Sequence, residues 1–312
     1  MVEIILETVN LSKKYKGREA LKNVSIALER GKIYGLVGIN GSGKTTLMSI
    51  ITGLVKSDSG KVMILNEDRL HNIIKKRKYV GSLIESTSFY PEMNAYENVN
   101  MERISKGIPN KELVDEVLKA VNLKDAGTKR VKHFSKGMKQ RLGIAKAMLG
   151  DPEIIILDEP NNDLDPISIL EIRNLLLSLN QEKNITILIS GQDLEDVEQL
   201  VTDFIIIHNG QIIEKISRED LHEKCQRYIS IRTQSLSITS AIFEKYLHTT
   251  NFKVMPDDSI KLYDYVDEVN QVIICLVEHQ IEIDSICIQE ESLETYFVHT
   301  IKEALNDQFI KN

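Results

Sequence analysis

Short apolar runs rich in β-branched residues recur along the first two thirds of the chain. They lie at Ile33–Val37, Ile154–Leu157, Ile185–Ile189 and Phe204–Ile207. Between the second and third runs, Ser168–Asn180 carries leucines and isoleucines at helical spacing. Strands that are buried on both faces read as continuous apolar runs, so this alternation of strands and helices predicts an α/β domain with a mostly parallel sheet.

Two segments depart from this alternation. Asn94–Met148 is almost entirely helix-patterned, most clearly at Lys111–Val121 and Gly137–Met148, which predicts a helical insertion over about residues 86–150. After Asn209-Gly210, a hairpin-type turn, shorter strand and helix patterns alternate to the end of the chain. We therefore predict a first domain over residues 1–215 and a small C-terminal α+β domain over residues 216–312.

The most specific motif follows the first apolar run. Residues Gly38-Ile-Asn-Gly-Ser-Gly-Lys-Thr-Thr46 fill the pattern G-x-x-x-x-G-K-[ST] between that strand and a predicted helix. Such a loop turns backbone N–H groups towards phosphate, and the helix N-terminus adds partial positive charge. Lys44 is expected at the β- and γ-phosphates of a nucleoside triphosphate, and the Thr45 hydroxyl at Mg²⁺. The predicted phosphate-binding residues are Gly38, Asn40, Gly41, Ser42, Gly43, Lys44, Thr45 and Thr46.

Two adjacent carboxylates end the second apolar run. Asp158 and Glu159 follow Ile154–Leu157 directly, so both are expected at the edge of the sheet where the phosphate loop lies. Asp158 is predicted to hold Mg²⁺ directly or through water. Glu159 is placed to polarise an attacking water, either as general base or as the group that orients the water.

Composition and charge narrow the class of protein. The chain has 312 residues, 42% of them apolar, and a net charge of −7, so there is no global basic field for nucleic acid. Its three cysteines lack metal-ligand spacing. There is no apolar stretch long enough for a membrane span and no signal-peptide pattern. We expect a soluble, cytoplasmic chain whose membrane role depends on another polypeptide.

A third motif opens the last predicted helix of the insertion, at Phe134-Ser-Lys-Gly-Met-Lys-Gln-Arg141. With the phosphate loop and Asp158-Glu159, in this order, the set resembles the nucleotide-binding subunit of ABC transporters over about residues 3–215. The resemblance implies a P-loop NTPase fold of the ABC ATPase type, ATP and Mg²⁺ as cofactors, and ATP hydrolysis. It further implies a second ABC ATPase subunit, expected to be an identical copy, and a separate transmembrane permease.

The resemblance also assigns residues outside the phosphate loop. Tyr15 matches the aromatic residue that stacks on adenine. Ser135 and Gly137 match the signature residues that complete the opposing subunit's site at its γ-phosphate. Leu164 and Asp165 match the loop that crosses the dimer interface.

Two positions differ from the usual family pattern. Glu85 stands where the family usually carries glutamine, and this looks like the bacitracin-resistance and lantibiotic-immunity branch. As an anionic oxygen ligand, Glu85 is predicted to serve Mg²⁺ and the attacking water. Gln192 stands where the family carries its switch histidine. Because glutamine cannot become cationic, we predict that ATP binding survives and that hydrolysis is slower.

The leading interpretation is a motor subunit that drives a separate permease on the inner face of the cell membrane. Export of a peptide antibiotic or similar amphiphile rests on resemblance alone, with Phe89, Tyr90 and Pro91 as candidate permease contacts. The alternative is a soluble ABC-type ATPase acting on ribosomes or nucleic acid, although the chain has neither a second nucleotide domain nor a coiled-coil insertion. A nucleotide kinase would not explain the two later motifs together. The C-terminal domain carries no chemical motif.

Overall fold

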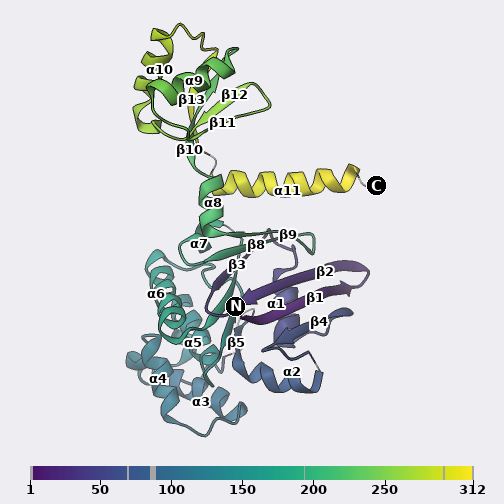
Figure 1. Cartoon of the computed structure of the whole chain (residues 1–312). Helices are drawn as coiled ribbons and strands as arrows, with labels where there is room; N and C mark the ends of the chain where they lie inside the picture. Colours follow the sequence, from purple (N-terminus) through teal and green to yellow (C-terminus); the bar gives the residue numbers. More distant parts are fainter. Residues whose placement is uncertain (1–2, 69, 85–88, 193, 291, 311–312) are drawn as a thin grey trace. The chain divides into compact units, whose positions relative to one another are not determined.

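The computed structural model describes residues 3–68, 70–84, 89–192, 194–290 and 292–310 (Figure 1). These residues form two compact units. The first contains the described residues up to Arg218 together with those from Thr300 onward, and the second contains Glu219–His299. Each unit has its own hydrophobic core.

A six-stranded sheet organises the first unit. Its strands run in the order β5 (Val80–Leu83), β6 (Ile154–Leu157), β7 (Thr186–Gly191), β3 (Ile33–Val37), β8 (Asp203–His208) and β9 (Gln211–Ser217). All neighbouring strands are parallel except β8 and β9. The predicted mostly parallel sheet is therefore confirmed. Because parallel strands end at one edge, the residues that follow β3, β6 and β7 meet there.

A second sheet in this unit was not predicted. Strands β1 (Ile4–Tyr15), β2 (Arg18–Glu29) and β4 (Ser59–Ile64) pair antiparallel in the order β2-β1-β4. Helix α1 (Lys44–Thr52) lies in the core that the two sheets share (Figure 1). Its buried side chains Leu47, Met48, Ile50 and Ile51 join residues of both sheets, among them Leu6, Leu28, Leu36 and Ile156. The helix that carries Lys44 is thereby held from two sides.

Helices surround the parallel sheet. Helices α3 (Ala95–Ser105), α4 (Glu112–Ala120) and α5 (Lys136–Ala147) lie between β5 and β6 in the chain, which confirms the helical insertion. The long helix α6 (Pro166–Lys183) connects β6 to β7, and the shorter helices are α2 (Leu70–Lys76) and α7 (Leu194–Glu198). Within the described ranges, none of the helices combines the length and apolar composition that a membrane span needs.

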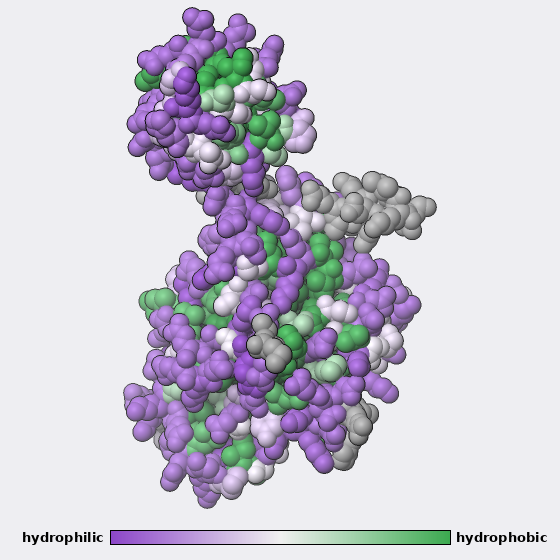
Figure 2. Space-filling model, viewed as in Figure 1, coloured by the Kyte–Doolittle hydropathy of each residue, from purple (hydrophilic) through white to green (hydrophobic). Residues whose placement is uncertain are grey.

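The second unit is a four-stranded antiparallel sheet with two helices. Its elements are β10 (Arg227–Arg232), α9 (Leu236–Tyr246), β11 (Phe252–Val254), β12 (Ser259–Leu262), α10 (Val269–Glu278) and β13 (Ser285–Glu290), with strand order β11-β12-β10-β13. Helices α8 (Arg218–Lys224) and α11 (Leu293–Ile310) flank it in sequence. On the face seen in Figure 2, both units are mainly hydrophilic with smaller apolar patches.

Candidate functional site

The phosphate loop joins β3 to α1, and its conformation requires glycine at position 43. Gly43 has a φ of 112°, and a Cβ there would lie 2.7 Å from the carbonyl oxygen of Ala20. Lys44, only 4% exposed, folds back over the loop and donates to the carbonyl oxygens of Gly38 at 2.6 Å and Ile39 at 3.4 Å. The loop therefore holds its lysine at the centre of the curve.

The other predicted loop residues occupy its rim and base. Asn40 and Gly41 are exposed, Thr46 is half-buried, and Ser42 is buried. The N–H of Gly210, in the turn between β8 and β9, donates to the Ser42 carbonyl oxygen at 2.8 Å. A neighbouring hairpin thus fixes the back of the loop.

Thr45 and Asp158 lie side by side, although 113 residues separate them in the chain. The Thr45 hydroxyl donates to Asp158 Oδ2 at 2.7 Å, and the Ser190 hydroxyl donates to Oδ1 at 2.5 Å. Hydroxyl and carboxylate oxygens are the ligands that Mg²⁺ prefers, usually with substrate phosphates as well. Within the described ranges, no group of three His, Cys, Asp or Glu residues is arranged to hold a metal ion, so phosphate oxygens would have to complete this set.

Glu159 is the second carboxylate at this edge, and several donors surround it. Its Oε1 lies 3.6 Å from Lys44 Nζ, while Oε2 accepts from Gln192 Nε2 at 2.9 Å and from Asn162 Nδ2 at 3.2 Å. Its backbone has a φ of 46°, in the left-handed region, which is uncommon outside glycine. Glu159, Ser190 and Gln192 line a hollow of about 310 Å³.

Two residues of this cluster, Ser190 and Asn162, were not predicted from the sequence. Ser190 is the last residue but one of β7, and Asn162 lies three residues after Glu159. Both contact the Asp158-Glu159 pair directly through hydrogen bonds. Nothing in the local pattern around Ser190 marks it. Only the sheet order, with β7 between β6 and β3, could have indicated its position.

Ser135, Gly137 and Asp165 form a second cluster where α5 and α6 begin. Ser135 caps α5, since its hydroxyl accepts from the Met138 N–H at 3.2 Å. A Cβ on Gly137 would lie 2.5 Å from the Ser168 hydroxyl oxygen, so glycine permits the two helices to approach. The Ser168 hydroxyl donates to Asp165 Oδ2 at 2.7 Å, and this bond lowers the pKa of Asp165. The predicted signature residues and the loop that ends at Asp165 therefore pack against each other.

Tyr15 stands at the end of β1 and is 44% exposed. It pairs with Arg18 across the β1–β2 hairpin, and Arg18 Nη2 would lie 3.7 Å from a Cβ built on Gly41. The tip of the hairpin therefore lies beside the phosphate loop. Glu85, which stands where the family usually carries glutamine, lies outside the described residues.

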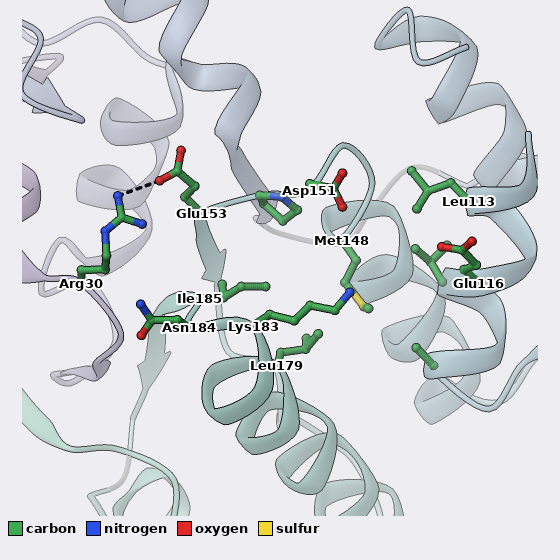
Figure 3. A pocket seen from close by; sticks show the side chains of 13 residues that line it. Arg30, Leu113, Glu116, Met148, Asp151, Glu153, Leu179, Lys183, Asn184 and Ile185 are labelled. Carbon is green, nitrogen blue, oxygen red and sulfur yellow. Dashed lines mark hydrogen bonds and ion pairs between the residues drawn. The ribbon is translucent and has the colours of Figure 1, made fainter. Parts of the chain in front are cut away.

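A separate cavity of about 270 Å³ lies where β6 and β7 begin, at the other end of these strands (Figure 3). Glu153 and Ile185, which directly precede these two strands, line it, and Arg30 Nη2 lies 2.7 Å from Glu153 Oε2. Lys183 and Met148 extend towards each other across the space (Figure 3). Among the residues that the structure describes, none of the predicted site residues lines this cavity.

Comparison with known proteins places the chain in a family. The family model described as "ABC transporter" matches residues 21–162. The bacitracin transport ATP-binding protein BcrA of Bacillus licheniformis is 38% identical over 297 residues, which cover 95% of this chain and 97% of BcrA. The chain belongs to the ABC transporter ATP-binding family. It is an ATP-binding subunit and an ATPase, as the three ordered motifs predicted.

Two further relatives of this ATPase subunit match a smaller share of the chain than BcrA does. The lantibiotic transport ATP-binding protein SrtF of Streptococcus pyogenes is 40% identical over 210 residues, 67% of this chain and 89% of SrtF. Among solved structures, a dimeric ATP-binding cassette in a post-hydrolysis state, bound to ADP and Pi, matches with a TM-score of 0.63 and 27% identity. It covers 69% of this chain and 99% of its own. The names of these relatives give no support to the ribosomal or nucleic-acid alternative.

Proposed function

We propose that two copies of this ATPase subunit close around two ATP molecules. The phosphate loop of one copy holds each nucleotide, with Tyr15 on its adenine, and the Ser135, Gly137 and Asp165 cluster of the other copy completes the site. Two features support this arrangement: the chain carries both clusters on separate elements, and a similar cassette is dimeric with ADP and Pi bound. Closure follows from ATP binding, and reopening from hydrolysis and loss of phosphate.

At each nucleotide, Thr45 and Asp158 would hold Mg²⁺ together with the phosphate oxygens, and Mg²⁺ supplies charge neutralisation at the β- and γ-phosphates. Lys44 contacts the same phosphates. Glu159 orients and deprotonates the attacking water, and Gln192 holds Glu159 by its amide. Glu85 would also serve Mg²⁺ and the attacking water, and this assignment rests on its place in the sequence. One observation carries this reaction: Thr45, Asp158 and Glu159 converge at one edge of the sheet.

The same proposal gives the ATPase a transport function. A separate permease receives the motion, and this holds the subunit on the inner face of the membrane. The match with BcrA over 95% of the chain supports export of a peptide antibiotic or a similar amphiphile. A hollow of about 380 Å³ lined by Phe89, Pro91, Lys136 and Leu164 offers a contact surface beside the start of α5. The C-terminal domain predicted over residues 216–312, which contains the second unit, would act as an accessory to this assembly.

A resistance assay tests the export function. The gene is expressed with its neighbouring permease genes in a sensitive host, which is then challenged with bacitracin and with a lantibiotic. We expect the minimal inhibitory concentration of one peptide to rise, and Glu159→Gln to remove the increase. A strain whose resistance does not change, although both proteins co-purify from its membranes, would overturn the proposed substrate class. Failure to co-purify with any permease would overturn the transport function itself.

A further inference from the structure

Ser190 makes two hydrogen bonds, one to the carboxylate of Asp158 and one to the backbone of Glu159. Its hydroxyl donates to Asp158 Oδ1 at 2.5 Å and accepts from the backbone N–H of Glu159 at 2.8 Å. A serine hydroxyl has one proton and two lone pairs, so both bonds form at once. Ser190 is 1% exposed, and water does not compete for either bond. We propose that Ser190 is a positioning residue that sets the orientation of Asp158 and Glu159 together. This inference rests on the proposed function of the site.

The bond to Asp158 selects which oxygen is available to the cation. With Oδ1 held by Ser190, only Oδ2 faces Thr45, at 2.7 Å from its hydroxyl. Asp158 Oδ2 and the Thr45 hydroxyl oxygen are thus the two oxygens that would hold Mg²⁺ in the proposed function. Without the Ser190 hydroxyl, the Asp158 carboxylate could rotate about its χ2 torsion, which is broad for aspartate. Ser190 therefore keeps one oxygen of Asp158 in the position that a cation needs.

The bond to Glu159 fixes the backbone from which the catalytic carboxylate projects. Glu159 has a φ of 46°, a conformation that costs free energy for a residue with a side chain and persists where its surroundings impose it. The Ser190 hydroxyl is the acceptor that holds the Glu159 N–H. Loss of this acceptor leaves a half-buried N–H unsatisfied and lets Glu159 move away from Lys44 and Gln192.

The order of the sheet explains why a residue of β7 has this role. Strand β7 lies between β6, which ends at Asp158-Glu159, and β3, which ends at the phosphate loop. A side chain at the end of β7 is therefore next to both strands that supply the chemistry. The Ser190 hydroxyl thereby links the Asp158 carboxylate to the backbone from which the Glu159 side chain projects.

Replacement of the hydroxyl tests the inference in the full-length chain. Ser190→Ala is expected to lower kcat for ATP about tenfold or more, because a hydrogen bond to a charged group is stronger than one between neutral groups. The KM for ATP should stay within about twofold, since the phosphate loop is unchanged. The Mg²⁺ concentration at half-maximal activity should rise several-fold. Binding of a fluorescent ATP analogue should be normal in EDTA but gain less affinity from Mg²⁺ than in the native chain.

Two variants and a control separate positioning from stability. Ser190→Thr keeps the hydroxyl and should restore most of kcat and of the Mg²⁺ response, while Ser190→Cys, close in volume with a weak donor, should fall between. Thr8 is the matched control, because its buried hydroxyl also donates one hydrogen bond and accepts another, and neither bond involves a carboxylate. It donates to the Val24 carbonyl oxygen at 3.2 Å and accepts from the Ile26 N–H at 3.0 Å. Thr8→Val should lower the melting temperature and leave kcat and the Mg²⁺ response unchanged.

Two results would overturn the inference. One is a Ser190→Ala chain with native kcat and native Mg²⁺ dependence. The other is a loss of activity of equal size in Ser190→Ala and Thr8→Val that follows their melting temperatures. A native chain that binds no ATP would instead overturn the proposed function, and the inference with it.

Discussion

The two units of this chain both place helices against a sheet, but only the first gathers chemistry at one place. In its parallel sheet the strands end at a common edge, so Thr45 and Asp158 bond although 113 residues separate them. In the antiparallel sheet of the second unit, the carboxyl ends of neighbouring strands lie at opposite edges, and the long-range polar contacts are spread in the same way. At one end of β10 Arg227 bonds to Asp267, and at the other end Arg232 bonds to Asp257. The type of sheet thus decides which unit can build a composite site.

The relatives show a matching contrast. The match with BcrA covers 95% of the chain, whereas the match with SrtF covers 67% and still spans 89% of SrtF. A match of 210 residues cannot include both units completely. ABC transport proteins of this kind therefore do not all share the full length of this chain. We expect the chemistry of ATP to depend on the first unit alone.

The strongest test of this contrast compares one carboxylate from each unit. Glu159→Gln should reduce the steady-state ATPase rate by about 10²–10⁴-fold, because glutamine cannot take the proton of the attacking water. Binding of a fluorescent ATP analogue should persist. Asp264→Asn, which changes a carboxylate bonded to Thr249 and Asn251 in the second unit, should leave the rate unchanged. An Asp264→Asn chain with strongly reduced activity would contradict the separation of roles.

Within the first unit, the hydrophobic pattern predicted the parallel strands much better than the antiparallel sheet β2-β1-β4. Strands β3 and β6 begin and end where their apolar runs do, because every residue in them is buried. In β1, polar residues and several register shifts interrupt the alternation that would mark a half-buried strand, and Asn10 has a positive φ. In the second unit, strand β11 has only three residues, too few for a period to be visible. These strands depend on pairing partners that the local sequence does not specify.

The site divides in the same way between local and distant information. The phosphate loop and Asp158-Glu159 are continuous motifs, so the sequence predicted them as candidates without knowledge of the fold. Ser190 becomes part of the cluster only because β7 lies between β6 and β3. For Gly137, the sequence predicted a place in the signature motif. The structure adds that Ser168 of α6 occupies the space where a side chain would be.

A pair of phenylalanines tests whether the two cores are energetically separate. Phe243 and Phe204 are completely buried, one in each unit. Each change to alanine should destabilise its own unit by about 3–5 kcal/mol. In calorimetry, Phe243→Ala should lower one unfolding transition, and ATP with Mg²⁺ should still raise the other. A single transition that both variants lower equally would show that the units unfold together.

Two glutamines give a smaller contrast in rate. Gln192 donates to Glu159, and its replacement by histidine supplies a side chain that can become cationic beside the γ-phosphate. We expect Gln192→His to raise the ATPase rate by roughly tenfold, which corresponds to a barrier lower by about 1.4 kcal/mol. Gln289→His, at an exposed position of the second unit, is the control and should change nothing. An unchanged or lower rate in Gln192→His would show that glutamine does not limit hydrolysis.

Two aspartates that accept a hydrogen bond from a serine hydroxyl should give the smallest effect, a small change in stability with pH. The hydroxyl of Ser168 lowers the pKa of Asp165 in the first unit, and that of Ser259 lowers the pKa of Asp257 in the second. An aspartate whose pKa is lower in the folded chain than in the unfolded chain, where it is about 3.9, stabilises the fold at a pH above 3.9. This contribution is lost as the pH falls through the pKa of the folded chain.

Asn caps a helix as well as Asp does, so Asp165→Asn removes the charge and keeps the cap. In urea unfolding, Asp165→Asn and Asp257→Asn should each be slightly less stable than the native chain at pH 7, and the differences should disappear in acid. Of the two variants, only Asp165→Asn should also lower the ATPase rate, because only Asp165 lies in the cluster with Ser135 and Gly137. A difference that persists unchanged in acid would mean that the side-chain shape, and not its charge, stabilises that unit.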